Sequence, residues 1–279
     1  MSSKELAGKV ALITGAGREG GLGQAIAQTL ASAGASIMLH DRGATAGEIA
    51  PAHGVGTKSQ LNTIADRIRA TGAKVETVTG DLLDETAIAA MVAKTVEKLG
   101  RLDILVNNAG IGYLFGPAVD ITAEQLDAVL GVNLRAPMLA IKHAARQMIK
   151  QGQGGRIINI ASQAGKSGFA LAAAYTASKH GLIGLTRSIA LELGDQGITV
   201  NAVCPNHVTT GLGSWQNDFM SKARGQTMEQ YMGEMRARIP LGRTCTPEDI
   251  AAAALFLCTP AAAYITAEAM NVSGGEEYH

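Results

Sequence analysis

The sequence has few cysteines, and they do not form a disulfide or metal-binding pattern. Cys204, Cys245 and Cys258 are the three cysteines of the 279-residue chain, and they stand singly, with no C-x-x-C pair. The six histidines are scattered without the spacing of metal ligands. We therefore predict no metal site, no disulfide framework and a reducing, cytoplasmic environment.

Long apolar runs and an excess of charge are also missing. No run of about 20 apolar residues occurs, so we expect neither a membrane span nor a signal peptide. The 24 basic and 24 acidic residues cancel, and no dense Lys/Arg run suggests a nucleic-acid partner. A chain that is 47% hydrophobic can nevertheless bury a substantial core without disulfides or metals.

Short apolar runs alternate along the chain with longer helical stretches. The runs have the length of strands buried on both faces, and they cover residues 10–13, 36–39, 73–78, 104–106, 157–160, 198–200 and 269–272. The predicted helices cover residues 22–33, 59–70, 85–99, 123–148 and 175–193. This alternation predicts a Rossmann-type, doubly wound α/β fold: a parallel sheet of about seven strands with helices on both faces. No linker divides the chain, so residues 1–279 are expected to form one domain.

Two segments interrupt this rhythm. Residues 42–58 are rich in Gly and Ala and predict a loop or a mobile lid. Residues 211–239 are long, polar and rich in Met, and they precede the last crossover. Because ligands bind at the carboxyl ends of parallel strands, we expect 211–239 to form a lid over the substrate.

A glycine cluster follows the first predicted strand and leads directly into a helix. Glycines at residues 14–23 would let the backbone turn sharply and approach a pyrophosphate, which the free N–H groups of the helix stabilise. Asp41, at the end of the second strand, can accept hydrogen bonds from both ribose hydroxyls of an adenosine and repel a 2′-phosphate. This favours NAD, although Arg18 and Arg42 leave NADP possible because a guanidinium pairs with phosphate.

A candidate acid/base pair lies on a later helix. Tyr175 and Lys179 are four residues apart and share a helix face, where an ammonium would lower the pKa of the phenol. Such a tyrosine can exchange a proton with an alcohol or ketone oxygen. Ser162, at the predicted carboxyl end of a strand, could hold that oxygen beside Tyr175.

These motifs resemble those of the short-chain dehydrogenase/reductase family along nearly the whole chain. The family's T-G-x-x-x-G-x-G loop corresponds to Thr14, Gly15, Gly21 and Gly23, with two extra residues inside it, and residues 107–110 reproduce its N-N-A-G. The P-G-x-V-x-T stretch is matched with Asn206 in place of its glycine. The resemblance implies a nicotinamide cofactor held by these residues: Gly15, Gly21, Leu22, Gly23, Asp41, Asp81, Leu82, Asn108, Ala109, Gly110, Tyr175, Lys179, Pro205, Val208 and Thr210.

The resemblance also implies an active-site tetrad of Asn133, Ser162, Tyr175 and Lys179. In such enzymes the tyrosine is the general acid/base and the serine orients the substrate oxygen. The lysine holds the nicotinamide ribose and lowers the tyrosine pKa, while the asparagine anchors a water in a proton relay. Family members usually pair two long helices with partner copies, which implies self-association as a homotetramer through helices 123–148 and 175–193.

The substrate is the least defined part of this prediction. Gln163, Asn206, His207 and Trp215 are expected near it, and the first three could hydrogen-bond hydroxyls, which favours a polyol or sugar-like compound. A 3-oxoacyl-ACP reductase or 3-hydroxyacyl-CoA dehydrogenase is an alternative, because Gly-rich residues 54–58 resemble those of hydroxyacyl-CoA dehydrogenases. A catalytically silent NAD-binding regulator is a third, which the intact Ser162, Tyr175 and Lys179 argue against.

Overall fold

The computed structural model describes residues 4–43, 56–112 and 114–279, and its centre is one parallel sheet. The strand order is β3-β2-β1-β4-β5-β6-β7, with every neighbouring pair parallel. This confirms the predicted fold class, including the seven strands. The strands are β1 (Val10–Ile13), β2 (Ser36–Asp41), β3 (Val75–Thr79), β4 (Ile104–Asn107), β5 (Gly155–Ile160), β6 (Ile198–Pro205) and β7 (Ala269–Val272).

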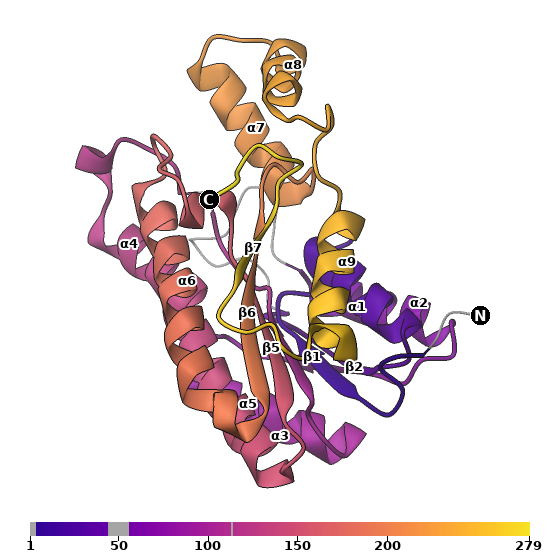
Figure 1. The fold of residues 1–279 in the computed structure, drawn as a ribbon. Coiled ribbons are helices and arrows are strands. Elements are labelled where there is room, and N and C mark those ends of the chain that lie inside the picture. Colours follow the sequence, from indigo (N-terminus) through magenta and orange to yellow (C-terminus); the bar gives the residue numbers. More distant parts are fainter. Residues whose placement is uncertain (1–3, 44–55, 113) are drawn as a thin grey trace.

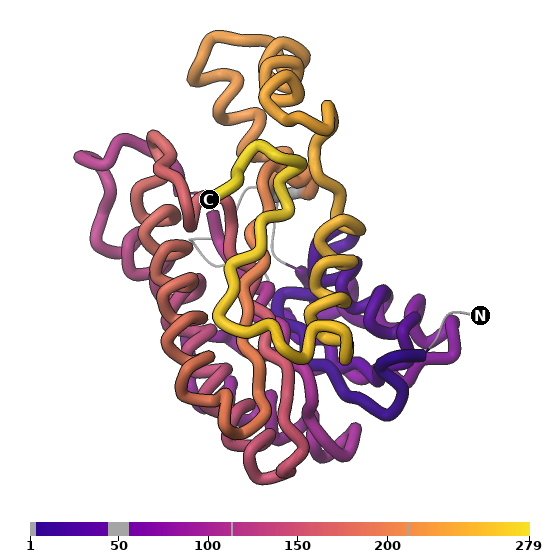
Figure 2. Tube along the Cα trace, in the orientation of Figure 1, coloured from indigo at the N-terminus to yellow at the C-terminus, as the bar shows by residue number. Residues whose placement is uncertain are grey.

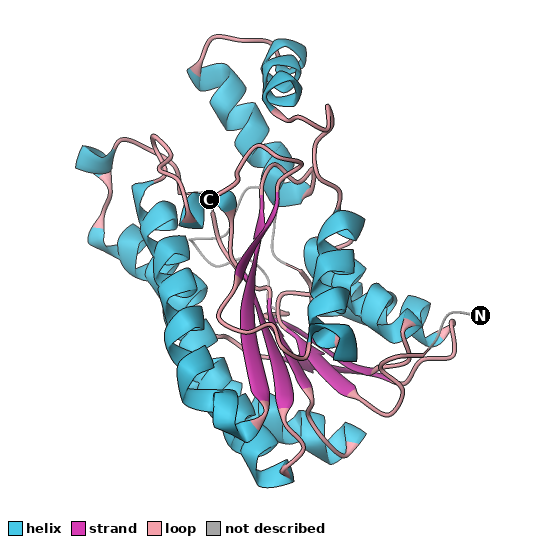
Figure 3. Cartoon of the chain, in the orientation of Figure 1, coloured by secondary structure: helices cyan, strands magenta, loops and turns pink. Residues whose placement is uncertain are grey.

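Helices cover both faces of the sheet (Figures 1 and 3). One layer contains α1 (Leu22–Ser32), α2 (Lys58–Arg69) and α9 (Pro247–Cys258). The opposite layer contains α3 (Glu85–Leu99), α4 (Ala123–Leu130), α5 (Ala136–Gln151) and α6 (Ala173–Leu193). Two further helices, α7 (Gly211–Ala223) and α8 (Met228–Arg238), project beyond the carboxyl ends of the strands (Figure 1).

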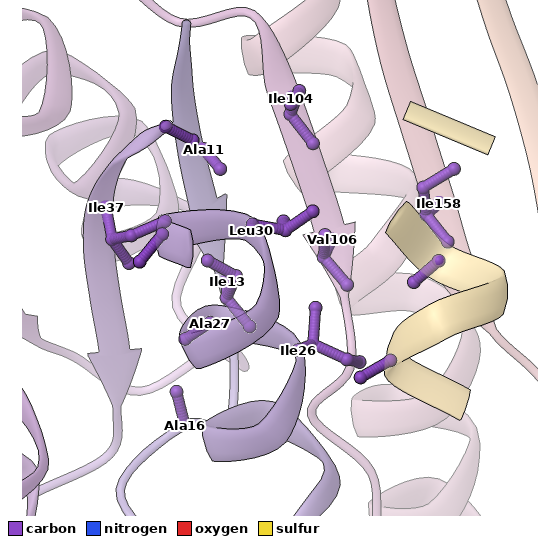
Figure 4. Packing of buried hydrophobic residues seen from close by; sticks show 14 of the residues in the cluster. Ala11, Ile13, Ala16, Ile26, Ala27, Leu30, Ile37, Ile104, Val106 and Ile158 are labelled. Atoms are coloured by element: carbon purple, nitrogen blue, oxygen red, sulfur yellow. The ribbon is translucent and has the colours of Figure 1, made fainter. Parts of the chain in front are cut away.

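Alternating side chains of each strand supply the two cores. Ile13 packs into the layer of α1 and α9, whereas its neighbour Leu12 packs into the layer of α3 and α5. Figure 4 shows Ile13 and Val106 pointing toward Ile26 and Leu30 of α1. Because both faces are covered, each of these strands reads as a continuous apolar run. Fully burying such a side chain contributes about 1.5–3 kcal/mol.

The strand order reverses direction between β1 and β4, which opens a crevice at their carboxyl ends. The loops after β1, β4, β5 and β6 therefore meet at one edge of the sheet. The C-terminal segment, yellow in Figure 2, returns to the same edge beside the start of α7. This convergence places residues from both ends of the sequence around one cleft.

One predicted helix differs from the structure. Residues 123–148 were expected to be continuous, but Gly131–Arg135 form a π-helical turn between α4 and α5. The π-helical turn is explained by a tertiary contact. The Asn133 Oδ1 accepts a hydrogen bond from the Ile111 nitrogen at 2.8 Å. Such π turns often occur at functional sites. Helix α6 matches its expected range to within two residues at its start.

Residues 211–239 form helices α7 and α8, and their role as a substrate lid stays a prediction. Of the loop predicted over 42–58, residues 44–55 lie outside the described residues. Across the part of the chain that is described, no helix combines the length and the apolar character needed to cross a membrane.

Candidate active site

A cavity of about 520 Å³ opens above β1 and β4, and glycine backbone forms part of its wall. Gly15 has a φ of +65°, and a Cβ there would lie 2.7 Å from the Cα of Ala109. A Cβ on Gly23 would lie 2.6 Å from the carbonyl oxygen of Gly15. The glycines thus keep open a cradle at the N-terminus of α1 that side chains would fill. Its free N–H groups fit the pyrophosphate of a dinucleotide.

The two extra loop residues extend this loop outward. The Gly21 nitrogen donates to the Arg18 carbonyl at 3.2 Å, which closes a turn over residues 18–21. Glu19 at the tip of the turn lies 2.8 Å from Arg67 of α2, and both side chains are about half exposed. Glu19 therefore faces α2 and solvent, whereas Arg18 and Gly21 at the two ends of the turn border the cavity.

Asp41 lies at the end of β2, as predicted, and borders the same cavity. Its Oδ2 accepts from the Gly17 nitrogen at 2.7 Å and its Oδ1 from the Arg42 nitrogen at 2.8 Å. Burial raises the pKa of this carboxyl, and the two backbone N–H groups and Arg18 oppose that rise. Arg18 and Arg42 border the cavity too, and the Arg42 Nε lies 3.2 Å from Asp81.

The N-N-A-G segment after β4 joins the two halves of the fold. The Asn108 amide donates to the carbonyls of Thr14 and Gly15 at 2.8 and 2.9 Å. Asn108 is therefore bonded to the glycine loop while it borders the cavity. Of the residues expected to hold a cofactor, the cavity is bordered by Gly15, Gly21, Leu22, Asp41, Asp81, Leu82, Asn108, Ala109, Gly110 and Thr210.

The predicted tetrad comes together from three elements. Ser162 follows β5 and hydrogen-bonds Tyr175, which lies with Lys179 on α6. The Lys179 Nζ donates to the Ile160 carbonyl at 2.8 Å and lies 5.6 Å from the centre of the Tyr175 ring. Asn133 donates to the Ile111 carbonyl at 2.8 Å and to the Ser178 Oγ at 3.1 Å. The π turn thus aims Asn133 at the loop beside Tyr175.

The protonation of Tyr175 differs from the prediction. Burial raises its pKa and outweighs the hydrogen bond to Ser162, instead of Lys179 lowering it. Lys179 is only 4% exposed, and burial lowers the pKa of its ammonium to about 8. Lys179 does not lower the pKa of Tyr175 because its Nζ bonds a backbone carbonyl and faces the tyrosine ring. In this arrangement Tyr175 carries its proton at neutral pH.

A second cavity, of about 180 Å³, extends from Tyr175 toward α7 and α8. It meets the first at Leu22, Asn108, Gly110 and Thr210, which border both. Of the predicted residues it brings together Ser162, Gln163, Tyr175, Lys179, Pro205, Asn206, His207, Val208 and Thr210. One continuous cleft therefore contains the predicted tyrosine, serine and lysine and most of the predicted substrate residues.

Trp215 does not border this cavity, unlike the prediction. Its ring packs against both Phe115 and Phe219, with centroid distances of 5.8 and 5.6 Å, and those two rings lie 6.0 Å from each other, so the three form one cluster. Phe115 does border the cavity, and its ring lies 6.4 Å from that of Tyr175. Trp215 therefore supports an aromatic wall from behind. Sequence alone could not show this, because the contact joins α7 to a loop 100 residues earlier in the chain.

Residues that the sequence analysis missed border the far end of the cavity or lie against it. Arg224 and Arg238 belong to residues 211–239, which were predicted to form a lid, and both border the cavity. Glu276 of the C-terminal segment accepts from the Asn206 Nδ2 at 3.2 Å and lies 3.5 Å from the His207 Nε2. Its other oxygen accepts from the Arg238 Nε at 3.3 Å. The only signal in the sequence was the charge of these residues, which is common on any surface.

Comparison with known proteins agrees with this geometry. The family model described as enoyl-(acyl carrier protein) reductase matches residues 15–277. A short-chain dehydrogenase/reductase of Armillaria gallica is 41% identical over 268 residues, which cover 96% of this chain and 95% of that protein.

Two further matches carry names of specific activities. A sorbitol dehydrogenase of Cereibacter sphaeroides is 36% identical over 279 residues, covering 97% of this chain and 98% of that protein. Among solved structures, the carveol dehydrogenase of Mycobacterium avium in complex with NAD superposes with a TM-score of 0.89. It is 30% identical, and the match covers 98% of both chains.

Proposed function

The chain belongs to the short-chain dehydrogenase/reductase family, whose members are oxidoreductases acting on CH–OH groups, and we propose that it interconverts a small hydroxylated secondary alcohol and its ketone with NAD. The observation that carries the proposal is the single cleft in which Ser162, Tyr175 and Lys179 lie beside the glycine cradle. A polyol or sugar-like substrate fits the amide groups of Gln163 and Asn206.

Tyr175 is the proposed general acid/base. During reduction its phenol donates a proton to the ketone oxygen, and during oxidation the phenolate takes the proton of the alcohol. Ser162 hydrogen-bonds Tyr175 and is placed to hold the same oxygen. When bound, the nicotinamide ring supplies or accepts the hydride. Because its pKa is raised, Tyr175 is better prepared to donate a proton than to accept one near neutral pH.

Lys179 and Asn133 are proposed as positioning groups around Tyr175. The Lys179 Nζ donates to the Ile160 carbonyl and lies 5.6 Å from the centre of the tyrosine ring, and with a bound cofactor it would hold a ribose hydroxyl. Asn133 fixes the backbone of Ile111, which borders the cavity above β1. Both residues keep the reacting groups in place, which is a large share of enzymatic rate enhancement.

The preference for NAD is proposed from the charges around the adenosine half of the cleft. The Asp41 carboxylate is 8% exposed and would repel a 2′-phosphate at this position. Arg42, which could attract that phosphate, is engaged by Asp81 at 3.2 Å. Arg18 interacts electrostatically with Asp41. These contacts leave the carboxylate as the decisive group.

The size of the substrate cavity bears on the thioester alternative. Its volume of about 180 Å³ is below the roughly 300–1,000 Å³ typical of drug-sized ligands. A long acyl chain would need more room than a small polyol. We therefore favour the small hydroxylated substrate over a 3-oxoacyl or 3-hydroxyacyl thioester.

The test is the appearance of reduced nicotinamide when the protein meets polyols, sugars and hydroxyacyl thioesters, each with NAD and with NADP. Tyr175→Phe keeps the ring and removes the transferable proton, so turnover should fall by about 10²–10⁴-fold with cofactor affinity retained. Turnover that survives in Tyr175→Phe would contradict the assignment of the acid/base. Cofactor binding without turnover of any compound by the wild type would instead support the NAD-binding regulator.

We also propose self-association as a homotetramer. Large apolar side chains are exposed on the helices expected to pair: Leu126 on α4, Met138 on α5 and Leu191 on α6, with Leu191 83% exposed. Between these helices runs a groove bordered by Leu134 and Gly184. Covering such surfaces is a common reason for association. A monomeric mass by light scattering at micromolar concentration would contradict it.

A further inference from the structure

The two halves of the cleft differ in charge. The cavity above β1 is bordered by two acids, Asp41 and Asp81, and by two bases, Arg18 and Arg42. Among the described residues, the substrate cavity is bordered by Lys179, Arg224 and Arg238 and by no Asp or Glu. A cleft bordered by one sign of charge concentrates ligands of the opposite sign. The substrate half therefore favours an anion.

Arg224 is the clearest of these cations. It lies between α7 and α8, and its guanidinium is 5.4 Å from the centre of the Tyr231 ring, which is 4% exposed. Stacking on an aromatic face keeps a guanidinium in place while its N–H donors remain available. No carboxylate of the described residues lies within ion-pair distance of Arg224. Arg224 is an exposed residue that borders the cavity, and its guanidinium has no carboxylate partner among the described residues.

Arg238 is the second arginine at the cavity, and a carboxylate outside the cavity lining pairs with it. Its Nε lies 3.3 Å from Glu276, whose side chain is 10% exposed. The same carboxylate accepts from Asn206 at 3.2 Å and lies 3.5 Å from His207. Glu276 itself does not border the cavity. Glu276 therefore holds Asn206, His207 and Arg238 of the cavity wall together. The pair with Glu276 uses the Nε of Arg238, and its two terminal nitrogens can donate to a ligand.

Two amide oxygens nearer to Tyr175 lack a partner. Gln163 is 8% exposed, and its Oε1 is buried without a hydrogen bond in the described structure. The same holds for the Oδ1 of Asn206, and both residues border the cavity. A buried acceptor without a donor destabilises the folded protein. Hydroxyl groups of a ligand would satisfy both oxygens.

We propose that the substrate is a hydroxylated acid. Its reacting CH–OH lies at Tyr175, a position that rests on the proposed function, and further hydroxyls donate to Gln163 and Asn206. Its acidic group, a carboxylate or a phosphate, binds Arg224 and the free edge of Arg238. This order of groups follows the cavity from α6 to the loop between α7 and α8. The enzyme would then oxidise a sugar acid or sugar phosphate in preference to the corresponding neutral polyol.

The experiment measures binding without turnover, through the fluorescence of Trp215. It is the one tryptophan of the sequence, and it stacks on Phe115 at the cavity. Tyr175→Phe protein, with and without NAD, is titrated with D-gluconate, D-sorbitol 6-phosphate and D-sorbitol. Each acid differs from D-sorbitol at one end of the chain: D-gluconate has a carboxylate at C1, and D-sorbitol 6-phosphate has a phosphate on C6. We expect at least one acid to bind about 10–100-fold more tightly than D-sorbitol, because a charge-assisted hydrogen bond is lost in the neutral compound.

Two substitutions assign the effect to the arginines. Arg224→Gln should remove most of the preference and Arg238→Gln a smaller part, because Arg238 is already paired with Glu276. Arg236→Gln is the matched control, since Arg236 is an exposed arginine of α8 like Arg238 but does not border the cavity. Preference for gluconate identifies a carboxylate site, and preference for the phosphate identifies a phosphate site.

Equal binding of acids and sorbitol, no binding of either acid, or a preference that survives both arginine substitutions would overturn the inference. The proposed function fails in a different way. If an acid binds through Arg224 but wild-type protein forms no reduced nicotinamide from it, the anion site stands and the oxidoreductase assignment of this cleft falls.

Discussion

The nucleotide half and the substrate half of the cleft are built from different chemistry. In the proposed nucleotide half, the shape of the wall is set by backbone, because Gly15 and Gly23 approach other main-chain atoms too closely for any side chain, while the Asp41 carboxylate is the proposed selector between NAD and NADP. Around the substrate the decisive groups are side chains, above all Gln163 and Arg224. The first half binds a group common to many enzymes and needs a fixed shape. In the proposed function the second half selects the substrate, and its side chains can differ between relatives that share the fold.

The largest expected effect comes from filling the backbone cradle. Gly15→Ala introduces a Cβ 2.7 Å from the Ala109 Cα at a φ of +65°. We expect loss of about 1–3 kcal/mol of folding stability and at least about tenfold weaker NAD binding. Gly20→Ala is the control, because its φ is also +65° but no atom lies within 4 Å. Urea unfolding and calorimetric titration with NAD measure both. Equal losses in the two variants would mean that strain alone, and not the cradle, is responsible.

The next effect concerns a buried base in the substrate half. The pKa of Lys179 is about 8 in the folded protein and 10.5 as its ordinary value. Between these values the unfolded chain keeps a proton that the folded protein releases, so stability rises with pH. Relative to Lys179→Met, wild-type protein should gain about 2 kcal/mol between pH 7 and pH 10. Urea unfolding at both pH values tests this, and a constant difference would show that Lys179 is not desolvated.

A smaller effect is expected when the Asp41 carboxylate in the nucleotide half is neutralised. Asp41→Asn removes the carboxylate but keeps an acceptor for the Gly17 nitrogen. The ratio of NADP to NAD dissociation constants should fall about tenfold, because a like-charge contact with the 2′-phosphate is removed. Asp66→Asn on α2 removes an exposed carboxylate that does not border the cavity. An unchanged ratio in Asp41→Asn, or an equal change in both variants, would remove Asp41 as the selector.

The smallest effect is expected at the loop insertion. Glu19→Gln breaks the exposed pair with Arg67, which lies at 2.8 Å. Exposed pairs contribute about 0.2–1 kcal/mol, so stability should fall by no more than that and NAD affinity should stay the same. A clear loss of NAD affinity would place the insertion inside the nucleotide site and weaken the division between backbone and side chains.

The sequence predicted the nucleotide half better than the substrate half for a physical reason. Buried parallel strands leave continuous apolar runs, and a close backbone approach requires glycine, so β1 and Gly15 are visible in a short window of sequence. The pairing of Tyr175 with Lys179 is visible in the same way, because the two residues share one helix face, whereas Asn133 was predicted from the family resemblance alone.

The remaining features depend on contacts between distant residues. Glu276 meets Asn206 across 70 positions of the chain. The π turn around Asn133 exists because of a bond to Ile111, 22 residues away. Trp215 was expected near the substrate, but it packs against Phe115 and does not border the cavity. The raised pKa of Tyr175 follows from burial, which spacing alone does not show.

The most direct test of this division is a crystal structure of Tyr175→Phe with NAD and the acid that binds most tightly in the fluorescence series. The account predicts the pyrophosphate at Gly15 and the α1 N-terminus, the substrate CH–OH at Ser162, and the acidic group within hydrogen-bond distance of Arg224 or Arg238. An acidic group directed toward solvent, or a nicotinamide ring remote from residue 175, would contradict it.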